Sequence, residues 1–392
     1  MLLPPSVRDE LGEEHLAVFV HELVEKLDLG EFEAGYQENG RPAYPPQLQL
    51  KVWLYAYALG VTSARRIERR LHEDLGFRFL AGGHKPDHWT LNEFRKRHPK
   101  AINDVFTQVL EAARSLGLGQ LGRVAIDSTR VAANASPNRA DTIQKLRAER
   151  AKLRRKIRRW QQQCNREDEE PSGGAAQAPA EWRKRLDEIP RQLEQLRKSG
   201  QRRGSRTDPE SRYLRTVGGF CLGYTGELAV SDDHFIVAQR VHQAPHDTAS
   251  LEPMTCAVQQ RCGSPPERVL ADSGYYAMPQ IRAVEQQGIP VLVPDKLMAR
   301  EIAGGERAPQ MNERQQQRTP GLKQLRERMR DPTTRTCYAR RKALVEPVFG
   351  VLKHQRGMRK FRCRGLHRVE TEWTLATTAY NVTRLFRLRP AG

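Results

Sequence analysis

The stretch GRVAIDSTRVAA, residues 122–133, places a single carboxylate inside a run of β-favouring residues. Val124, Ile126 and Val131 predict a buried strand, and Asp127 lies between them. An ionised side chain inside a buried strand is costly unless a cation or a hydrogen-bond donor compensates it. Asp127 is therefore the first candidate for a functional residue.

Strands and helices follow this strand in a regular order. Two further strands are predicted over 226–232 and 234–242, and Asp232 and Asp233 form a turn between them. Helix, strand, helix and strand are then predicted over 248–260, 267–275, 279–287 and 289–295. Three early strands followed by alternating helices and strands predict a mixed α/β domain over 121–392.

An inserted helical hairpin is predicted over 138–203, between the first two strands. Apolar residues recur at heptad spacing in two segments, at Leu146, Leu153, Ile157 and Trp160 and then at Trp182, Leu186, Ile189, Leu193 and Leu196. The stretch EDEEPSGGAAQAPA, residues 167–180, predicts a flexible loop between them. The alternative is an intermolecular coiled coil, but segments this short would make a weak dimer zipper.

The first 120 residues predict an all-α domain. Leu48, Val52, Tyr55 and Leu59 lie at helical spacing before Gly60. Ser63 then begins a second helix, whose exposed positions hold several arginines, among them Arg65, Arg66 and Arg69. A capping box formed by Thr90 and Glu93 predicts the start of a third helix, which is basic and carries Arg95 and Lys96. Short basic helices with tight turns are typical of helix-turn-helix-like DNA-binding units, although an ordinary bundle with solvated arginines gives the same pattern.

The charge balance favours a polyanionic partner. The 392 residues carry a formal net charge of +19, and nucleic acid is the usual partner of such a chain. An anionic membrane is the competing partner, but no apolar run approaches the length of a transmembrane helix. The N-terminus lacks the pattern of a signal peptide, and the six cysteines include no CxxC pair. We therefore expect a cytoplasmic, nucleoid-associated protein with reduced cysteines and no membrane partner.

Two further carboxylates stand out by their context. Asp272 ends the predicted strand in RVLADSGY, and Glu346 lies in the basic helical segment ARRKALVEPVFGVLKHQRG. Each has an ordinary alternative, since an aspartate at a strand end often forms a turn and a glutamate before a proline suits a first helical turn. Together with Asp127 they form a set of hard oxygen donors, which selects Mg²⁺ or Mn²⁺.

Other polar and aromatic residues are expected to have supporting roles. His242 and His246 flank the third predicted strand beside Asp247, but imidazole suits Mg²⁺ less well than oxygen donors do. We therefore expect these histidines to be structural or close to DNA. Trp89 and Trp373 are expected in the core.

At this point the sequence resembles the insertion-sequence DDE transposases, which join an RNase H-like catalytic domain to a helical N-terminal domain. The resemblance covers nearly the whole chain. It rests on the blocks VAIDSTRVAANAS, DPESRYLRTVGGFCLGYTGELAV, HFIVAQRVHQAPHDTASLEPM, LADSGYY and VEPVFGVLK, in that order. It implies that Asp127, Asp272 and Glu346 bind two Mg²⁺ or Mn²⁺ ions and catalyse DNA cleavage and strand transfer.

The resemblance also suggests which cations meet the DNA. The family has a tyrosine–arginine–glutamate–lysine signature, and Lys353 keeps its distance of seven residues from Glu346. The first half departs from the pattern, because Lys342 stands where arginine is expected and Arg341 is its neighbour. Lys353, with Arg341 or Lys342, is expected to contact phosphate near the scissile bond. The 335–389 segment, with fourteen Lys and Arg against three Glu, fits DNA passage along this face.

Three alternatives to a transposase remain open. The first is an RNase H-like nuclease or resolvase that hydrolyses DNA without strand transfer. The second is a transposase-derived DNA-binding protein whose catalytic site has decayed, and the third is a basic RNA-associated structural protein. The preferred function predicts double-stranded DNA as the partner, both as transposon ends and as target. It also predicts a homodimer on DNA, because two ends are cut together.

Overall fold

The computed structural model describes residues 7–34, 44–136, 140–167, 178–216 and 218–389. A six-stranded mixed sheet forms the centre of the second half of the chain. Its strands are β1 (Arg123–Ala132), β4 (Arg212–Thr216), β5 (Gly219–Val230), β6 (Ile236–His242), β7 (Arg268–Ala271) and β8 (Val291–Leu292). The mixed α/β prediction is confirmed.

Strand β1 lies in the middle of this sheet. It pairs antiparallel with β5 and parallel with β7, which in turn pairs parallel with β8. β5 is long enough for β4 and β6 to pair with different parts of its other edge. Val124 and Ile126 are fully buried, as the β-favouring residues of the opening stretch predict. Asp127 therefore lies on the central strand of the sheet.

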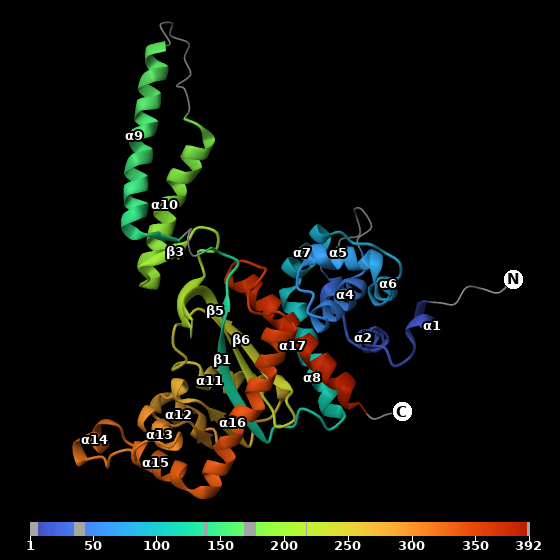
Figure 1. The fold of residues 1–392 in the computed structure, drawn as a ribbon, viewed down its shortest axis with the longest axis vertical. Coiled ribbons are helices and arrows are strands. Elements are labelled where there is room, and N and C mark those ends of the chain that lie inside the picture. The colour runs from blue at the N-terminus through green and yellow to red at the C-terminus, as the bar shows by residue number, and fades with distance from the viewer. Residues whose placement is uncertain (1–6, 35–43, 137–139, 168–177, 217, 390–392) are drawn as a thin grey trace, which may run out of the picture.

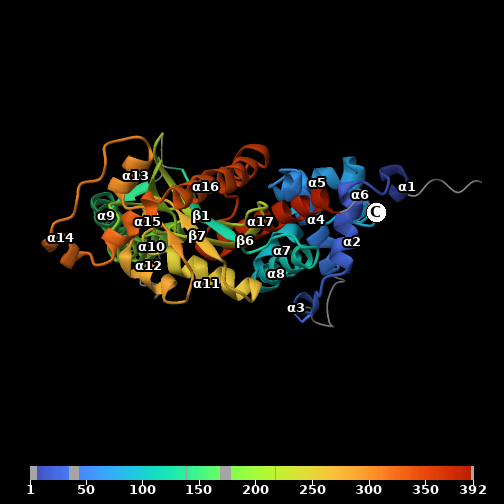
Figure 2. The same ribbon diagram turned by 90° about the horizontal axis from the view of Figure 1, so that it is seen from below.

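Helices cover both faces of the sheet. Figure 2 shows α16 (Pro332–Gly350) and α11 (Leu251–Cys262) on opposite sides of the strands. α12 (Met278–Glu285) connects β7 to β8. Three helices lie between β8 and α16 that the sequence patterns did not predict, namely α13 (Lys296–Ile302), α14 (Glu313–Arg318) and α15 (Leu322–Arg330).

The described residues before β1 form helices only. They are α1 (Val7–Leu11), α2 (Leu16–Glu25), α3 (Gly30–Glu33), α4 (Pro46–Ala58), α5 (Ala64–Glu73), α6 (Leu75–Leu80), α7 (His88–Arg97) and α8 (Pro99–Ser115). The predicted capping box is wrong: Asp87 caps α7 by accepting a hydrogen bond from the backbone N–H of Thr90, which is already helical. The helix therefore begins three residues earlier, at His88 and not at Leu91.

The long helix α17 (Leu366–Leu388) joins these helices to the sheet. It packs against α4 and α8 on one side and against β6 on the other. Its Trp373 is fully buried, as expected, and a Cβ built on Gly226 of β5 would lie 2.9 Å from the Trp373 ring. One hydrophobic core runs through both halves. The predicted boundary at residue 120 thus marks a change of secondary structure and not a gap in the core.

The two helices of the predicted insertion are present and run side by side. α9 (Ile143–Glu167) and α10 (Ala180–Ser199) project from the body as an arm (Figure 1). Leu146 packs with Ile189, Leu193 and Leu196 in a small core of their own. The short strands β2 (Ala140–Thr142) and β3 (Arg203–Ser205) pair at the base. Most of the predicted loop over 167–180 lies outside the described residues.

The composition led to two expectations, one about the cysteines and one about membrane-spanning helices. All six cysteines are free, as expected for reduced thiols. Among the described residues, no helix combines the length and the apolarity needed to cross a bilayer.

Candidate active site

Asp127 and Asp272 follow matching positions on neighbouring parallel strands. Ile126 of β1 is the register partner of Ala271 of β7, and each aspartate comes directly after this pair. The carboxylate of Asp127 accepts a hydrogen bond from the backbone N–H of Ser128 at 2.7 Å. That of Asp272 accepts one from the N–H of Gly274 at 2.8 Å and caps the short 3-10 helix η2 (Ser273–Tyr275). Strand pairing thus brings the two predicted aspartates together.

The two aspartates influence each other electrostatically. The pKa of Asp127 is raised from 3.8 to about 6; burial is the largest cause and the nearby charge of Asp272 adds to it, while Arg341 opposes both effects. Nη1 of Arg341 lies 3.1 Å from Oδ2 of Asp127. Two carboxylates with one balancing cation leave an excess of negative charge at this end of the sheet.

Helix α16 supplies the side chains that face these aspartates. Arg341 is buried and carries the ion pair to Asp127, while Tyr338, one turn earlier, is near enough to both aspartates for their charges to raise the pKa of its phenol. Burial is the larger cause of that shift. Lys342 is exposed and makes no ion pair within the described residues. Of the two candidate cations, the structure brings Arg341 to the carboxylates.

The structure leaves Glu346 on the surface of α16. Its side chain is exposed and makes no hydrogen bond or ion pair in the part of the chain that the structure describes. It lies five residues after Arg341, about 140° around the helix, and on the same flank as Lys342. No contact in the structure joins Glu346 to either aspartate, so its place in the site stays a prediction.

Lys353 lies beside the strand of Asp127. It follows α16 in the π-helical turn η3 (Val351–Gln355), and its Nζ donates to Oγ1 of Thr129 at 2.6 Å. Thr129 is two residues after Asp127, so both side chains emerge on the same face of β1. Burial lowers the pKa of the half-buried Lys353, and the nearby charge of Arg359 lowers it further. A cation is therefore held on the face of β1 that carries Asp127.

A second polar cluster lies beside the aspartates, on the face of the sheet opposite to Asp127. It consists of Glu227 of β5, His242 of β6 and Asp247, whose ligand-type atoms lie within 4.8 Å of one another. Asp247 accepts a hydrogen bond from Oγ of Ser128 at 2.9 Å and forms an ion pair with Arg130 at 3.2 Å. Because Ser128 and Arg130 belong to β1, the cluster braces the strand that carries Asp127.

Hydrogen bonding within this cluster argues against a metal ion there. The backbone N–H of Ala244 donates to Nδ1 of His242, so the proton of a neutral ring lies on Nε2. That nitrogen is 3.4 Å from Oε1 of Glu227, which also accepts a hydrogen bond from Tyr275. A metal on Nε2 would need the proton on Nδ1. The structural role expected for His242 fits this arrangement.

Sequence reasoning did not single out Glu227. It is fully buried and lies opposite Ser128 in the register of β5 and β1. The signal was the same as for Asp127, namely one carboxylate inside an apolar strand, in GELAV. A single carboxylate inside an apolar strand can thus indicate a buried polar cluster as well as a candidate catalytic residue.

The N-terminal candidates for DNA contact divide into two groups. Arg65, Arg66 and Arg69 are exposed on α5, and Lys96 is exposed on α7, where it forms an ion pair with Glu93 at 2.9 Å. Arg95 is different, and its predicted surface role needs correction.

Arg95 is 4% exposed, stacks over Trp53 and donates to the hydroxyl of Tyr57. A guanidinium enclosed in this way serves the packing of the helices and cannot reach a phosphate at the surface. Trp89, expected in the core, is 62% exposed. Both positions depend on how α7 packs against the neighbouring helices, which the sequence pattern alone does not show.

Comparison with known families gives two matches. Residues 5–97 match a family described as Transposase domain (DUF772), and residues 191–382 match a family described as Transposase DDE domain. The second range includes Asp272, Glu346 and Lys353, whereas Asp127 and α9 lie between the two ranges. No curated protein and no solved structure matches the chain significantly. The two matched ranges together cover well over half of the sequence, and the chain belongs to the insertion-sequence DDE transposases.

Proposed function

We propose that this protein cuts the ends of an insertion sequence and joins them to target DNA, using Asp127, Asp272 and Glu346. The observation that carries the proposal is the pair of aspartates on adjacent parallel strands, with the pKa of Asp127 raised to about 6. The sheet supports it too: β1, β5 and β6 pair antiparallel in chain order, and β7 and β8 then follow in parallel, which is the order of an RNase H-like domain, while β4 adds to the edge of β5.

The residues present fit two Mg²⁺ or Mn²⁺ ions. Burial raises the pKa of Asp127 most and the charge of Asp272 adds to it, with only Arg341 to oppose them; a divalent cation would supply the missing positive charge. Glu346 has no bond to give up among the described residues, so its carboxylate can become a ligand at little cost. When bound, such ions activate the attacking oxygen and stabilise the charge that develops on the phosphate.

The cations of the chain have separate tasks in this proposal. Arg341 balances the charge of Asp127 and holds its carboxylate in place. Through its bond to Thr129, Lys353 lies on the face of β1 that carries Asp127, two residues further along the strand. A phosphate approaching the carboxylates would meet it there. Lys342 is exposed and available for a more distant phosphate.

The N-terminal helices provide a second surface for DNA. Arg65, Arg66 and Arg69 are exposed on one short helix, and Lys96 is exposed on another. They would bind double-stranded DNA at the transposon end, mainly through phosphates. A homodimer on DNA is part of the proposal, because both ends are cut together.

The experiment that tests the proposal uses DNA carrying the terminal repeats that flank the coding sequence. With Mg²⁺ we expect a free 3′ hydroxyl at each end and its joining to a supercoiled target plasmid. The Asp272→Asn variant is the control and should bind the end without cutting it. Cutting without joining would indicate a nuclease or resolvase, and binding without cutting by the natural protein would indicate a decayed transposase.

A further inference from the structure

The outer face of α9 carries charge of one sign. The helix holds ten Lys and Arg against two Glu. Six of these side chains are exposed, have no ion-pair partner among the described residues and, by helical spacing, point away from α10. They are Arg147, Lys152, Arg154, Arg155, Arg158 and Arg159. Lys145 and Lys156 have partners within the arm, Asp141 and the ring of Trp182. A basic surface therefore runs along one helix of the arm.

The partner helix shows that this charge is not a general feature of the arm. The exposed residues of α10 mix both signs, with Glu181, Asp187 and Glu194 among the basic residues, and Lys198 pairs with Glu194 at 2.8 Å. On α9, by contrast, Arg154 faces Arg158 and Arg155 faces Arg159 at a spacing of four residues. Such like-charged pairs each destabilise a helix by roughly 0.2–0.5 kcal/mol. An anionic partner would offset this repulsion.

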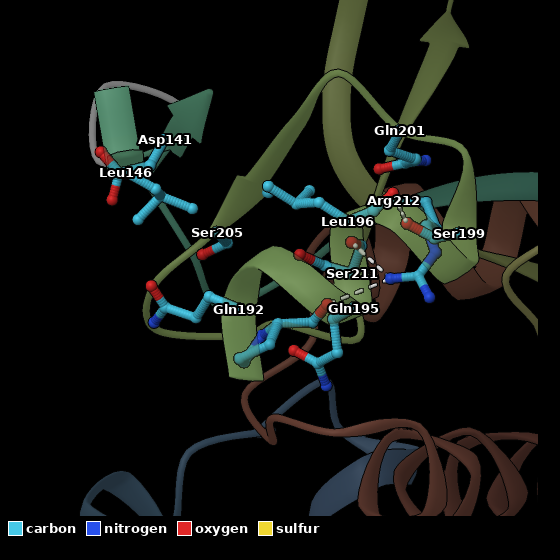
Figure 3. Close-up of a pocket in the computed structure, with 12 residues that line it drawn as sticks. Asp141, Leu146, Gln192, Gln195, Leu196, Ser199, Gln201, Ser205, Ser211 and Arg212 are labelled. Carbon is cyan, nitrogen blue, oxygen red and sulfur yellow. Dashed lines mark hydrogen bonds between the residues drawn. The ribbon is translucent and has the colours of Figure 1, made fainter. Parts of the chain in front are cut away.

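The base of the arm fixes the direction of α9. Asp141 is 2% exposed and forms ion pairs with Lys145 and Arg206. Glu149 of α9 lies 2.8 Å from Arg185 of α10 and 2.6 Å from Arg206. Figure 3 shows the pocket at this base, which Asp141 and Leu146 line together with Leu196 and Ser205. Together with the paired strands β2 and β3, these contacts make the arm a braced extension of the sheet.

From these observations, and on the basis of the function proposed above, we propose that the outer face of α9 binds the phosphate backbone of double-stranded DNA beyond the cleavage site. The 25 residues of α9 extend about 37 Å. Arg147 to Arg159 span about 18 Å, the length of roughly five base pairs. Between Arg147 and Arg159 the exposed face holds no amide side chain, and such a surface suits contact with phosphates more than recognition of bases.

Two other partners fit the surface less well. A second copy of the chain would need an apolar seam, but Leu146, Ile189, Leu193 and Leu196 already close the seam between α9 and α10. A membrane surface would need apolar residues next to the basic ones. The exposed positions of α9 from 147 to 159 hold only basic residues and two alanines, Ala148 and Ala151.

The test compares two variants of the full chain that remove the same number of charges. The first replaces Arg154, Arg155, Arg158 and Arg159 of α9 by Gln. The second replaces Lys184, Arg191, Arg197 and Lys198 of α10 by Gln, all of which are exposed. Affinity for an end duplex and for a random duplex is measured in EDTA between about 0.05 and 0.2 M salt.

For the α9 variant we expect the slope of log K against log salt to flatten by about 3 to 4, which corresponds to four lost phosphate contacts. Affinity should fall at least ten-fold, and the α10 variant should change the slope by less than about 1. A third variant with Lys at the four α9 positions should keep the natural slope, which separates lost charge from lost fold. If only the end duplex is affected, the arm binds the end; if both are, it binds flanking or target DNA as well.

Equal effects of the α9 and α10 variants, or no effect of the α9 variant, would overturn the proposal. A loss of affinity for double-stranded RNA alone would also do so. Binding in EDTA does not depend on catalysis, so this result stands apart from the proposed reaction. An α9 variant that still cuts a short end at saturating protein would show that the arm binds DNA and takes no part in the chemistry.

Discussion

Replacing Asp127 by Asn should make the metal-free protein more stable at neutral pH. The pKa of Asp127 is raised from 3.8 to about 6, so the folded protein binds this proton more tightly than the unfolded chain does. The stability contributed by this group is fully present below pH 3.8 and is lost as the pH rises through about 6. A shift of this size corresponds to a loss of about 3 kcal/mol at pH 7.5, which a neutral Asn avoids.

The assay is urea unfolding of the natural protein and the Asp127→Asn variant in EDTA, at pH 4 and at pH 7.5. We expect a gain in unfolding free energy of up to about 3 kcal/mol at pH 7.5 and almost none at pH 4. Adding Mg²⁺ should stabilise the natural protein only, by about 2.7 kcal/mol at a hundred times its dissociation constant. The matched control is Asp232→Asn, which removes the carboxylate that pairs with Arg123 at 2.9 Å. That control should lose stability at pH 7.5.

A variant Asp127→Asn that is less stable than the natural protein at pH 7.5 without metal would refute this reasoning. So would an unchanged pH dependence between 4 and 6. Either result would mean that Arg341 and the neighbouring hydrogen bonds fully compensate the charge of Asp127. The carboxylate pair would then need no cation.

The structure supports three further predictions. Lys353→Met should lower the cleavage rate about 100-fold while end affinity measured by fluorescence anisotropy changes little, because one charged donor near Thr129 is lost; an unchanged rate would place Lys353 outside the reaction. Leu193→Ala should destabilise the arm by about 2–5 kcal/mol and expose it to proteases, leaving the sheet protected in hydrogen exchange; equal loosening of both would show that the arm is not a separate core. Gly226→Ala should lower the unfolding free energy by about 1–3 kcal/mol, because its Cβ would press on Trp373; an unchanged urea midpoint would mean that the ring shifts freely.

The sequence was most informative where the signal is local. A run of β-favouring residues predicted the strand of Asp127, and heptad spacing predicted both helices of the arm, because these patterns depend only on neighbours in the chain. Short strands such as β3 and β4 were missed, since three to five residues do not establish a period. The helices between residues 296 and 330 were missed as well.

The geometry of the site depends on contacts between distant segments, which one sequence does not show. The approach of Asp272 to Asp127 follows from the register of β7 and β1, and only the family resemblance pointed to it. One position along a helix turns a side chain by about 100°, so the choice between Arg341 and Lys342 depends on how α16 lies on the sheet. The burial of Arg95 has the same origin, because the packing of α7 against the neighbouring helices decides which of its faces meets the core.

The proposed site of three carboxylates is tested most directly at Glu346, since this residue is exposed on α16 and no contact joins it to the two aspartates. The measurement is the rate of 3′-hydroxyl release from an end duplex in Mg²⁺ for Glu346→Gln, with Glu313→Gln, which removes an exposed carboxylate of α14, as the control. We predict a fall of about 1000-fold or more for Glu346→Gln, at unchanged end affinity and unchanged unfolding free energy. Glu346→Gln protein that cuts the end as fast as the natural protein would contradict the three-carboxylate site.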